Sequence, residues 1–240
     1  VPNFESPVDY QLITGGHSNL TFKCEDATGR AVVLRRPPLG HVLESAHDMS
    51  REYRIIHALR QTKVPVPEAL GLCQDKTVNG ADFYVMDFVE GVVLNDAVIG
   101  STIPAQARPD LAHNVIHILC DLHDVDMDAV GLGTLGRKEA YLSRQLNRWN
   151  KQWQATKTHD IPEMEASSAL LMERIPEQLG ASIVHGDFRL GNMIVDQGRV
   201  EAILDWELCT LGDPLADLGY LLNNWLGEDE VVGIDVADQP

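Results

Sequence analysis

Two carboxylates and a carboxamide stand at fixed offsets near the C-terminal end of the sequence. The run His185-Gly-Asp-Phe-Arg-Leu-Gly-Asn192 is followed, thirteen residues after that Asn, by Asp205-Trp-Glu. Asp187 can accept the proton of a hydroxyl group, and Asn192 and Asp205 offer hard oxygen ligands of the kind that Mg²⁺ prefers. This grouping suits phosphoryl transfer, in which a protein positions a hydroxyl and neutralises charge on phosphates.

Short strands are expected to bring these side chains together. The pattern predicts a strand before His185, a tight polar loop, a second strand at Met193-Ile-Val195, a turn at Gln197-Gly198 and a third strand from Val200 to Leu204. Asp205 follows the end of that strand, so the three polar groups should meet at the rim of one hairpin. The alternative is a polar hairpin turn with no catalytic role. Such a turn gives no reason for several residues to stand at these fixed offsets, so it explains the pattern less well.

The spacing His-x-Asp-x-x-x-x-Asn with a later Asp resembles the catalytic and metal loops of the kinase superfamily. His-Gly-Asp stands where protein kinases carry His-Arg-Asp, and Asp-Trp-Glu stands where they carry Asp-Phe-Gly. Both differences point away from protein kinases and toward small-molecule kinases that resemble aminoglycoside phosphotransferases. The resemblance implies ATP as the phosphoryl donor and Mg²⁺ as the metal.

A glycine-rich run near the N-terminus lies between two predicted strands. It consists of Gly15, Gly16, His17, Ser18 and Asn19. Glycines let backbone N–H groups approach a phosphate, and the Ser18 hydroxyl adds a donor. On its own the run predicts only a hairpin turn, and its interpretation as a phosphate-covering loop depends on the catalytic hairpin.

Kinases also carry a strand Lys that contacts the α and β phosphates and pairs with a Glu on a helix. The run Ala31-Val-Val-Leu-Arg35-Arg36 has Arg35 at that place, and Glu52 on the next predicted helix is its expected partner. Arg keeps the charge and can bind a phosphate through two nitrogens, but it is bulkier than Lys. A solvated strand Arg and an exposed helix Glu are the alternatives.

The run Tyr84-Val-Met86-Asp87-Phe88-Val89-Glu-Gly91 resembles the kinase segment that binds adenine between the lobes. Adenine is expected to bond to the carbonyl of Asp87 and the N–H of Val89, with Met86 beside the ring. A strand that ends in a turn explains the same residues equally well, because backbone contacts leave little trace in side chains.

The predicted secondary structure changes near Gly91 from mainly strands to mainly helices. Upstream, short strands are predicted at 11–14, 20–24, 31–34, 68–73 and 83–89, with a helix at 45–60 and a loop at 75–80. Downstream, helices are predicted at 111–122, 138–157, 163–179 and 216–225, the third capped by Gly180. The predicted fold is α+β and bilobal like that of protein kinases. A nucleotide-binding lobe over 1–89 is followed by a helical lobe over 90–240 that carries the catalytic and metal loops.

Composition limits the classes of partner. The 240-residue chain has 44% hydrophobic and 23% charged residues, which is ordinary for a globular protein. A formal charge of -17 argues against nucleic-acid and anionic-membrane partners, which require clustered Lys and Arg. The sequence has no apolar run of membrane-spanning length and no visible signal peptide. Four cysteines lie far apart and are expected to be reduced, which favours a cytoplasmic protein.

Two other runs imitate binding motifs. Gly131-Leu-Gly133-Thr-Leu-Gly136 fits the dinucleotide fingerprint, but it follows the acidic run Asp124-Val-Asp-Met-Asp128 instead of a buried strand. The acidic run begins like a calcium loop, yet Ala129 stands where Gly is required and Leu135 stands where Glu is required. A solvated connection between helices is the better interpretation of both.

The stretches Val184–Asn192 and Leu204–Tyr220 are very similar to the phosphotransferase family that includes aminoglycoside phosphotransferases. Leu34–Pro38, Leu122–Asp126 and Val130–Gly133 resemble, more narrowly, the branch related to the kinase-like domains joined to acyl-CoA dehydrogenases. The resemblance covers nearly the whole chain, and in this branch Arg replaces the strand Lys.

By position, the resemblance implies Asp187 as the catalytic base and Asn192 and Asp205 as metal ligands. It implies His185 as a support of the catalytic loop. The acceptors of the family are diverse, and the narrower branch implies a hydroxyacyl compound. Family members normally continue with further helices that complete the acceptor pocket, so the second lobe is expected to be incomplete. Asp213 and Asp217 are implied as structural acids.

Three functions remain open at this point. An ATP- and Mg²⁺-dependent kinase of a small hydroxyl-bearing substrate fits the residues best. A nucleotide-binding module of the same fold without transfer activity is the second. An antibiotic kinase of the aminoglycoside type is a narrower form of the first.

Overall fold

A five-stranded antiparallel sheet forms the N-terminal part of the protein. The computed structural model describes residue 2 and residues 4–13, 19–38 and 48–223. Within them the sheet has the order β1-β2-β3-β5-β4. Its strands are β1 (Asp9–Ile13), β2 (Leu20–Glu25), β3 (Ala31–Arg36), β4 (Ala69–Cys73) and β5 (Phe83–Asp87). The strands predicted from short apolar runs between turn residues are therefore confirmed, with ends shifted by a few residues.

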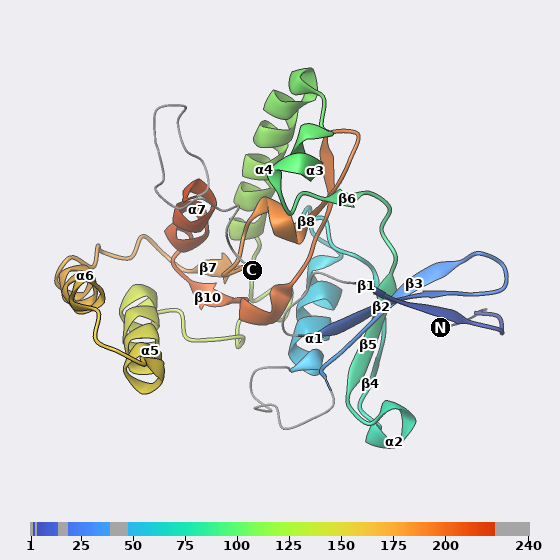
Figure 1. Cartoon of the computed structure of the whole chain (residues 1–240), viewed down its shortest axis with the longest axis horizontal. Coiled ribbons are helices and arrows are strands. Elements are labelled where there is room, and N and C mark those ends of the chain that lie inside the picture. Colours follow the sequence, from blue (N-terminus) through green and yellow to red (C-terminus); the bar gives the residue numbers. More distant parts are fainter. Residues whose placement is uncertain (1, 3, 14–18, 39–47, 224–240) are drawn as a thin grey trace.

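Helix α1 (Met49–Leu59) packs against β4 and β5 on one face of this sheet (Figure 1). Asp48 caps its first turn by accepting a hydrogen bond from the Arg51 N–H at 3.0 Å. The buried stripe of the helix consists of Met49, Glu52, Ile55, Ile56 and Leu59. Because Glu52 belongs to this stripe, its carboxylate is held between helix and sheet.

The predicted loop over 75–80 was wrong, because it contains the short helix α2 (Lys76–Asn79). Asp75 caps the start by accepting from the Thr77 N–H at 2.9 Å. Gly80 ends it in the left-handed region at φ 73°, where a glycine meets no Cβ penalty.

Helices dominate the described residues that follow β5. They are α3 (Ala97–Ser101), α4 (Arg108–His123), α5 (Tyr141–Thr156), α6 (Pro162–Glu173) and α7 (Leu215–Leu222). Helix α4 is central: its buried residues follow the expected helical spacing, and it contacts β7 (Ser182–Val184) and β9 (Arg199–Ile203). Helices α5 and α6 pack against each other at the end of the molecule opposite the sheet (Figure 1).

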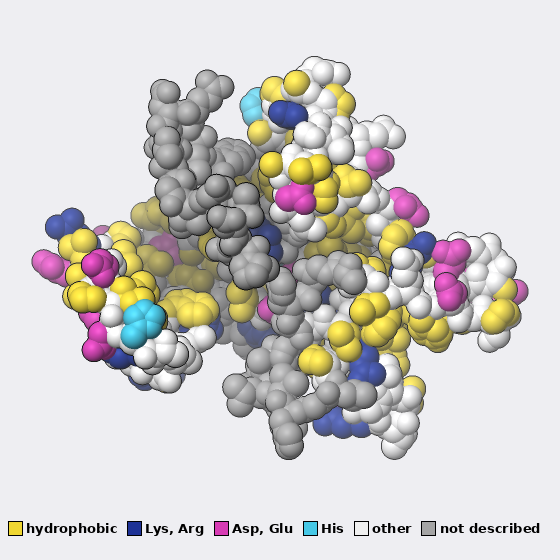
Figure 2. Space-filling view, viewed as in Figure 1, with side chains coloured by type: hydrophobic (Ala, Val, Ile, Leu, Met, Phe, Trp, Pro, Cys, Tyr) yellow, Lys and Arg dark blue, Asp and Glu magenta, His cyan; other side chains and the backbone are white. Residues whose placement is uncertain are grey.

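The predicted helix over 163–179 was wrong at its C-terminal end. Helix α6 stops at Glu173 and is capped at Arg174, so Gly180 is not its cap. Pro176 disfavours a helical conformation at the preceding Ile175, which accounts for the early stop. Helix α6 buries none of its residues, and Figure 2 shows apolar side chains gathered over the α5–α6 end of the molecule. Leu170 and Leu171 are among the exposed ones.

Two small antiparallel sheets hold the segment over residues 182–205, which the sequence predicts to be the catalytic hairpin. One has the order β6-β8-β9, with β6 (Val92–Val93) and β8 (Met193–Asp196), and the other pairs β10 (Thr210–Gly212) with β7. The segment that follows β5 thus joins directly to the hairpin, because Val92 pairs with Val195. The sequence did not predict β6 or β10, which have only two and three residues.

The glycine-rich run at 131–136 belongs to the turns between α4 and α5, as the sequence indicated, and no strand precedes it within 108–136. Leu132 and Leu135 are buried there as part of the core. Among the described residues, no helix is both long and apolar enough to cross a bilayer.

Asp26 closes the turn between β2 and β3. Its Oδ1 accepts hydrogen bonds from the Thr28 N–H (2.8 Å), the Thr28 hydroxyl (2.6 Å) and the Arg30 N–H (3.0 Å). These bonds, that of the Thr28 hydroxyl first, lower the pKa of Asp26 from 3.8 to about 2. Since the pKa is lower in the folded than in the unfolded state, the stabilisation is present above the unfolded value and is lost as the pH falls toward the folded one.

We therefore expect Asp26→Asn to be less stable than the parent at about pH 6, and the difference to shrink as the pH falls to about 3. Urea unfolding followed by circular dichroism measures it. Asp9→Asn, on the exposed strand β1, is the control and should show no such trend. A deficit of Asp26→Asn that stays constant with pH would contradict the role given to the ionised carboxylate.

Candidate functional site

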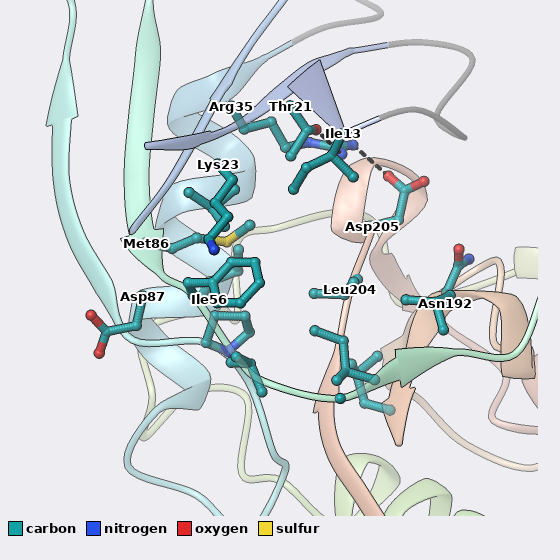
Figure 3. A pocket seen from close by; sticks show the side chains of 18 of the residues that line it. Ile13, Thr21, Lys23, Arg35, Ile56, Met86, Asp87, Asn192, Leu204 and Asp205 are labelled. Carbon is teal, nitrogen blue, oxygen red and sulfur yellow. Dashed lines mark hydrogen bonds and ion pairs between the residues drawn. The ribbon is translucent and has the colours of Figure 1, made fainter. Parts of the chain in front are cut away.

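A cavity of about 800 Å³ lies between the five-stranded sheet and the catalytic hairpin (Figure 3). Strands β1, β2, β3 and β5 line one side, and residues 187–207 contribute the other. Its polar lining includes Thr21, Lys23, Arg35, Asp187, Asn192 and Asp205. The three side chains singled out from the sequence therefore border one space.

Asp205 reaches this cavity through an unusual backbone conformation. Strand β9 ends at Ile203, and Asp205 then adopts φ 64° and ψ 62°, in the left-handed region. Asp tolerates this region better than most residues, but it still costs on the order of 1 kcal/mol. The next residue, Trp206, is fully buried and donates its indole N–H to the Ile203 carbonyl at 3.0 Å. The buried Trp206 thus fixes the turn, and the Asp205 carboxylate faces the cavity.

Asn192 and Asp187 are joined by hydrogen bonds. The Asn192 Nδ2 donates to the backbone carbonyl of Asp187 at 2.9 Å and to its Oδ2 at 2.6 Å. The amide carbonyl oxygen of Asn192 is therefore directed away from Asp187. In Figure 3 Asn192 and Asp205 lie at the same end of the cavity.

Two further side chains act on Asp187, and the sequence motifs indicated neither of them. The Nε of Arg189 donates to Oδ1 and Oδ2 of Asp187 at 3.2 and 3.3 Å. Burial, followed by the nearby Asp187 carboxylate, raises the pKa of the Tyr220 hydroxyl on α7. The alternation of the extended loop could have indicated Arg189, since it stands two residues after Asp187.

Arg35 connects the sheet, helix α1 and the loop over residues 205–207, which is the expected metal loop. Its Nη2 contacts Asp205 Oδ1 at 2.7 Å, and its Nε forms an ion pair with Glu52 Oε2 at 3.0 Å. The Tyr84 hydroxyl donates to the same Glu52 oxygen at 3.0 Å. The structure thus joins Arg35 to Glu52, the partner expected from the sequence, and adds a contact to Asp205 that the sequence did not suggest.

Burial sets the electrostatics of this group. It raises the pKa of Glu52, and the charge of Arg35 and the Tyr84 hydroxyl act in the opposite direction. Burial acts to lower the pKa of Arg35. The Glu52 carboxylate, the neighbouring Tyr84 and the Asp205 carboxylate act in the opposite direction and outweigh it, so the pKa lies above its ordinary value. We treat Arg35 and Glu52 as an ionised pair, because an Arg remains protonated in proteins and its charge stabilises the carboxylate.

His185 lies behind the cavity and not on its surface. Its side chain is fully buried, its Nε2 donates to the Leu204 carbonyl at 2.9 Å, and its Nδ1 accepts from the Asp187 N–H at 3.2 Å. This bonding pattern fits a neutral ring with the proton on Nε2. His185 therefore connects the catalytic loop to the end of β9, next to Asp205.

Asp217 of α7 anchors the same loop from the other side. Its two carboxylate oxygens accept from the backbone N–H groups of His185 (2.7 Å) and Gly186 (2.8 Å). The carboxylate is fully buried and also contacts Nε2 of His123 at 3.3 Å. Gly186 has φ 87°, which a side chain would strain. Asp217 thus fixes the loop in a form that only Gly adopts easily.

The expected adenine segment borders the cavity. Met86, Asp87 and Val89 are all among its lining residues, together with the apolar side chains of Val33 and Ile203. The Asp87 carboxylate points away from the cavity in Figure 3, so only its backbone can serve a ligand there. The Asp87 N–H is already bonded to the Glu68 carbonyl at 2.9 Å.

The glycine-rich loop is described only in part. Gly15, Gly16 and Ser18 lie outside the described residues. Asn19 is buried, and its Nδ2 donates to Glu52 Oε1 at 3.2 Å and to Glu207 Oε2 at 3.4 Å. A phosphate contact from Asn19 stays a prediction, while these two bonds join the start of β2 to α1 and the metal loop.

The donors of the site fit Mg²⁺ better than a transition metal. In the part of the chain that the structure describes, no three His, Cys, Asp or Glu side chains gather as a metal cluster. One carboxylate and one amide oxygen suit a hard ion that retains waters and takes phosphate oxygens, whereas zinc favours His and Cys. Asp205 is 30% exposed, so one of its oxygens can face a ligand while the other contacts Arg35.

Sequence comparison places the chain among known proteins. A sequence model described as "phosphotransferase enzyme family" matches residues 9–237. Acyl-CoA dehydrogenase family member 10 from Mus musculus is 39% identical over 216 residues, which cover 89% of this chain and 20% of the mouse protein. Acyl-CoA dehydrogenase family member 11 from Gallus gallus is 40% identical over 210 residues, which cover 86% of this chain and 27% of the chicken protein. The chain therefore spans between 20% and 27% of the length of these relatives.

Solved structures show the same fold. A proposed aminoglycoside phosphotransferase from Ralstonia eutropha JMP134 superimposes with a TM-score of 0.79 at 36% identity, covering 99% of this chain and 71% of that one. A thermostable aminoglycoside phosphotransferase in complex with ADP and hygromycin B gives a TM-score of 0.64 at 21% identity, covering 88% of this chain and 70% of that one. The α+β, kinase-like fold expected from the sequence is thus confirmed.

The buried hydrogen bonds of Asp217 predict that its replacement lowers the free energy of unfolding. Asp217→Asn keeps one acceptor oxygen and turns an amide N–H₂ toward a backbone N–H of the loop. We expect a loss of about 2–4 kcal/mol in the free energy of unfolding, because a buried charge-assisted bond is replaced by an unsatisfied donor. Denaturant titration measures it, with the exposed Asp196→Asn as the matched control. A variant as stable as the control would contradict the anchoring role.

Proposed function

The chain belongs to the phosphotransferase enzyme family, and from this membership we propose that it transfers the γ-phosphoryl group of ATP to a hydroxyl group of a small molecule. The observation that carries the proposal is that Asp187, Asn192, Asp205 and Arg35 border one cavity. The same cavity has an apolar end near Met86, of a kind that suits a purine ring. A donor with both an aromatic base and a polyphosphate matches this division.

The nucleotide would lie with its base near Met86 and its phosphates toward Arg35. Arg35 can contact the α and β phosphates, because its guanidinium is held by Glu52 and Asp205 at the cavity wall. A guanidinium fixed in this way loses little further freedom on binding a phosphate. Glu52 therefore acts as a positioning residue for Arg35.

Asn192 and Asp205 would hold the Mg²⁺ ion through the amide oxygen and a carboxylate oxygen. The bound ion would neutralise negative charge on the phosphates and orient them. Asp205 is suited to this task because its backbone turn is fixed by the buried Trp206. Asn192 is suited because its Nδ2 is bonded to Asp187, which leaves the amide oxygen for the ion.

Asp187 is the proposed catalytic base. The acceptor hydroxyl would lose its proton to the Asp187 carboxylate while its oxygen forms a bond to the γ phosphorus. The bond from that phosphorus to the oxygen bridging the β and γ phosphates would break in line, and ADP would leave. His185 acts on Asp187 only through the backbone, by accepting from its N–H.

A hydroxyacyl compound is the acceptor that we propose. The relatives that are 39% and 40% identical to this chain are named as acyl-CoA dehydrogenase family members, and that name refers to an acyl-group substrate. An enzyme of acyl groups and a kinase of hydroxyacyl groups share one class of substrate. An aminoglycoside acceptor is the competing outcome of the test, as is a module that binds nucleotide without transfer.

The metal site has a direct test. We expect Mg²⁺ to increase the affinity of the parent for ATP, and Asp205→Ala to lose on the order of tenfold or more of that increase, since even residues that only support metal ligands contribute this much. Calorimetric titration of ATP with and without Mg²⁺ measures it, with Asp196→Asn as the control. A variant in which Mg²⁺ still strengthens ATP binding as in the parent would remove Asp205 from the metal site.

The transfer step has a second test, based on ADP release in a screen of hydroxyacyl thioesters and aminoglycosides. With an accepted substrate, Asp187→Asn should lower kcat by about 10² to 10⁴ while the affinity for Mg·ATP changes little, because proton acceptance is lost and the phosphate contacts remain. Turnover equal to that of the parent would exclude Asp187 as the base. Mg·ATP binding without ADP release for every acceptor would favour the non-catalytic module.

A further inference from the structure

Arg189 places a second cation at the phosphate end of the cavity. Its Nε donates to both carboxylate oxygens of Asp187 at 3.2 and 3.3 Å, and its side chain lines the same cavity as Arg35 and Asn192. The side chain is 41% exposed. An ion pair with so much solvent access contributes little to stability, so the contact with Asp187 does not by itself explain a fixed Arg at this place.

The backbone explains why Arg189 and Asp187 share a face. Arg189 has φ −149° and ψ 160°, an extended conformation in which successive side chains point to opposite sides. Phe188 is fully buried in the core. Because Phe188 takes the inner side, the residues on either side of it face the cavity together.

Gly191 provides the space in which the guanidinium lies. A Cβ added at Gly191 would be 2.2 Å from Nη1 and 3.2 Å from Cζ of Arg189. Gly191 is not among the glycines with positive φ, so its backbone could accommodate a side chain. The absence of a side chain at this position therefore serves the placement of Arg189.

The orientation of the guanidinium leaves donors for a second anion. The bonds to Asp187 use only Nε, and among the described residues neither terminal nitrogen donates a hydrogen bond. Arg35 is already held by Glu52 and Asp205. In phosphoryl transfer the charge spreads over three equatorial oxygens of the moving group, and cations placed there lower the barrier most.

We propose that Arg189 binds the phosphoryl group during its transfer, with Nε on Asp187 and the terminal nitrogens on the equatorial oxygens. This inference rests on the proposed phosphotransferase function. As the acceptor oxygen forms its bond to phosphorus and the bond to the ADP oxygen breaks, the hydroxyl proton passes to Asp187. Arg189 keeps its own protons and holds the base and the moving group in line.

A mimic of the moving group tests the proposal without knowledge of the acceptor. Aluminium fluoride bound beside Mg·ADP takes the flat shape and negative charge of a phosphoryl group in transfer. We expect it to increase the affinity of the parent for Mg·ADP. We expect Arg189→Ala to lower the affinity for the fluoride complex on the order of 100-fold while the affinity for Mg·ADP stays within about twofold.

Three further variants sharpen the result. Arg189→Lys should fall between the parent and Arg189→Ala, because it retains charge without the planar fork. Gly191→Ala should weaken the fluoride complex in the same direction as Arg189→Ala, because the added Cβ would displace the guanidinium without removing any charged side chain. Arg199→Ala removes an exposed Arg at the first position of β9 and should behave as the parent.

The outcomes separate this inference from the proposed function. A parent that does not bind Mg·ADP would contradict the proposed function itself. A parent that binds Mg·ADP but gains no affinity from aluminium fluoride would overturn the role of Arg189. Fluoride binding by Arg189→Ala equal to that of the parent would overturn it too, as would an equal loss for Mg·ADP and its fluoride complex, which would make Arg189 an ordinary nucleotide contact.

Discussion

The site depends on one buried guanidinium. Arg35 lies on β3, contacts Glu52 on α1 and reaches Asp205 on the metal loop, 170 residues further along the chain. Its side chain is 12% exposed and that of Glu52 is 2% exposed, so neither charge could remain there without the other. The sheet, the helix and the metal loop are therefore coupled through a single ion-pair network. Asn19 extends this network, because its amide reaches both Glu52 and Glu207.

A second constraint acts on the backbone of the catalytic hairpin. Asp205 adopts the left-handed region, which a non-glycine residue avoids unless its surroundings fix it, and Gly186 has a positive φ that only glycine adopts easily. The surroundings here are buried: His185 bonds to the Leu204 carbonyl, and Asp217 bonds to two N–H groups of the loop. The strain at Asp205 is thus compensated beneath the surface, by buried hydrogen bonds that fix the backbone carrying the carboxylates that face the cavity. Rigid placement of this kind is what electrostatic catalysis requires.

The sequence predicted the parts of this site that depend on local spacing. Asp187, Asn192 and Asp205 follow strand and turn signals closely enough that their meeting at one hairpin could be expected. Contacts between distant segments were harder to foresee. The pairing of Arg35 with Glu52 was found only through the kinase pattern, and nothing local indicated that Arg35 also reaches Asp205.

Other features escaped prediction for different physical reasons. Strands β6 and β10 exist because neighbouring segments pair with them, and they are too short to show a pattern of their own. Helix α2 depends on its caps, Asp75 and Gly80, more than on apolar periodicity. Such elements are set by tertiary context, which a single sequence reports poorly.

The balance of charge around the cavity differs from the net charge of the whole chain. The formal charge of -17 suggests a protein that repels anions. The charged residues lining the cavity are instead nearly balanced, with Lys23, Arg35 and Arg189 against Asp87, Asp187, Asp205 and Glu207. Arg35 contacts one of these carboxylates and Arg189 another, so the local field arises from fixed pairs rather than from net charge. A polycationic acceptor drawn to the acidic surface would meet Arg189 beside Asp187, the proposed base, whereas a neutral or anionic hydroxyl compound would not be repelled there. The arrangement of charge around Asp187 therefore argues for an uncharged or acidic acceptor more strongly than the composition of the chain argues for a basic one.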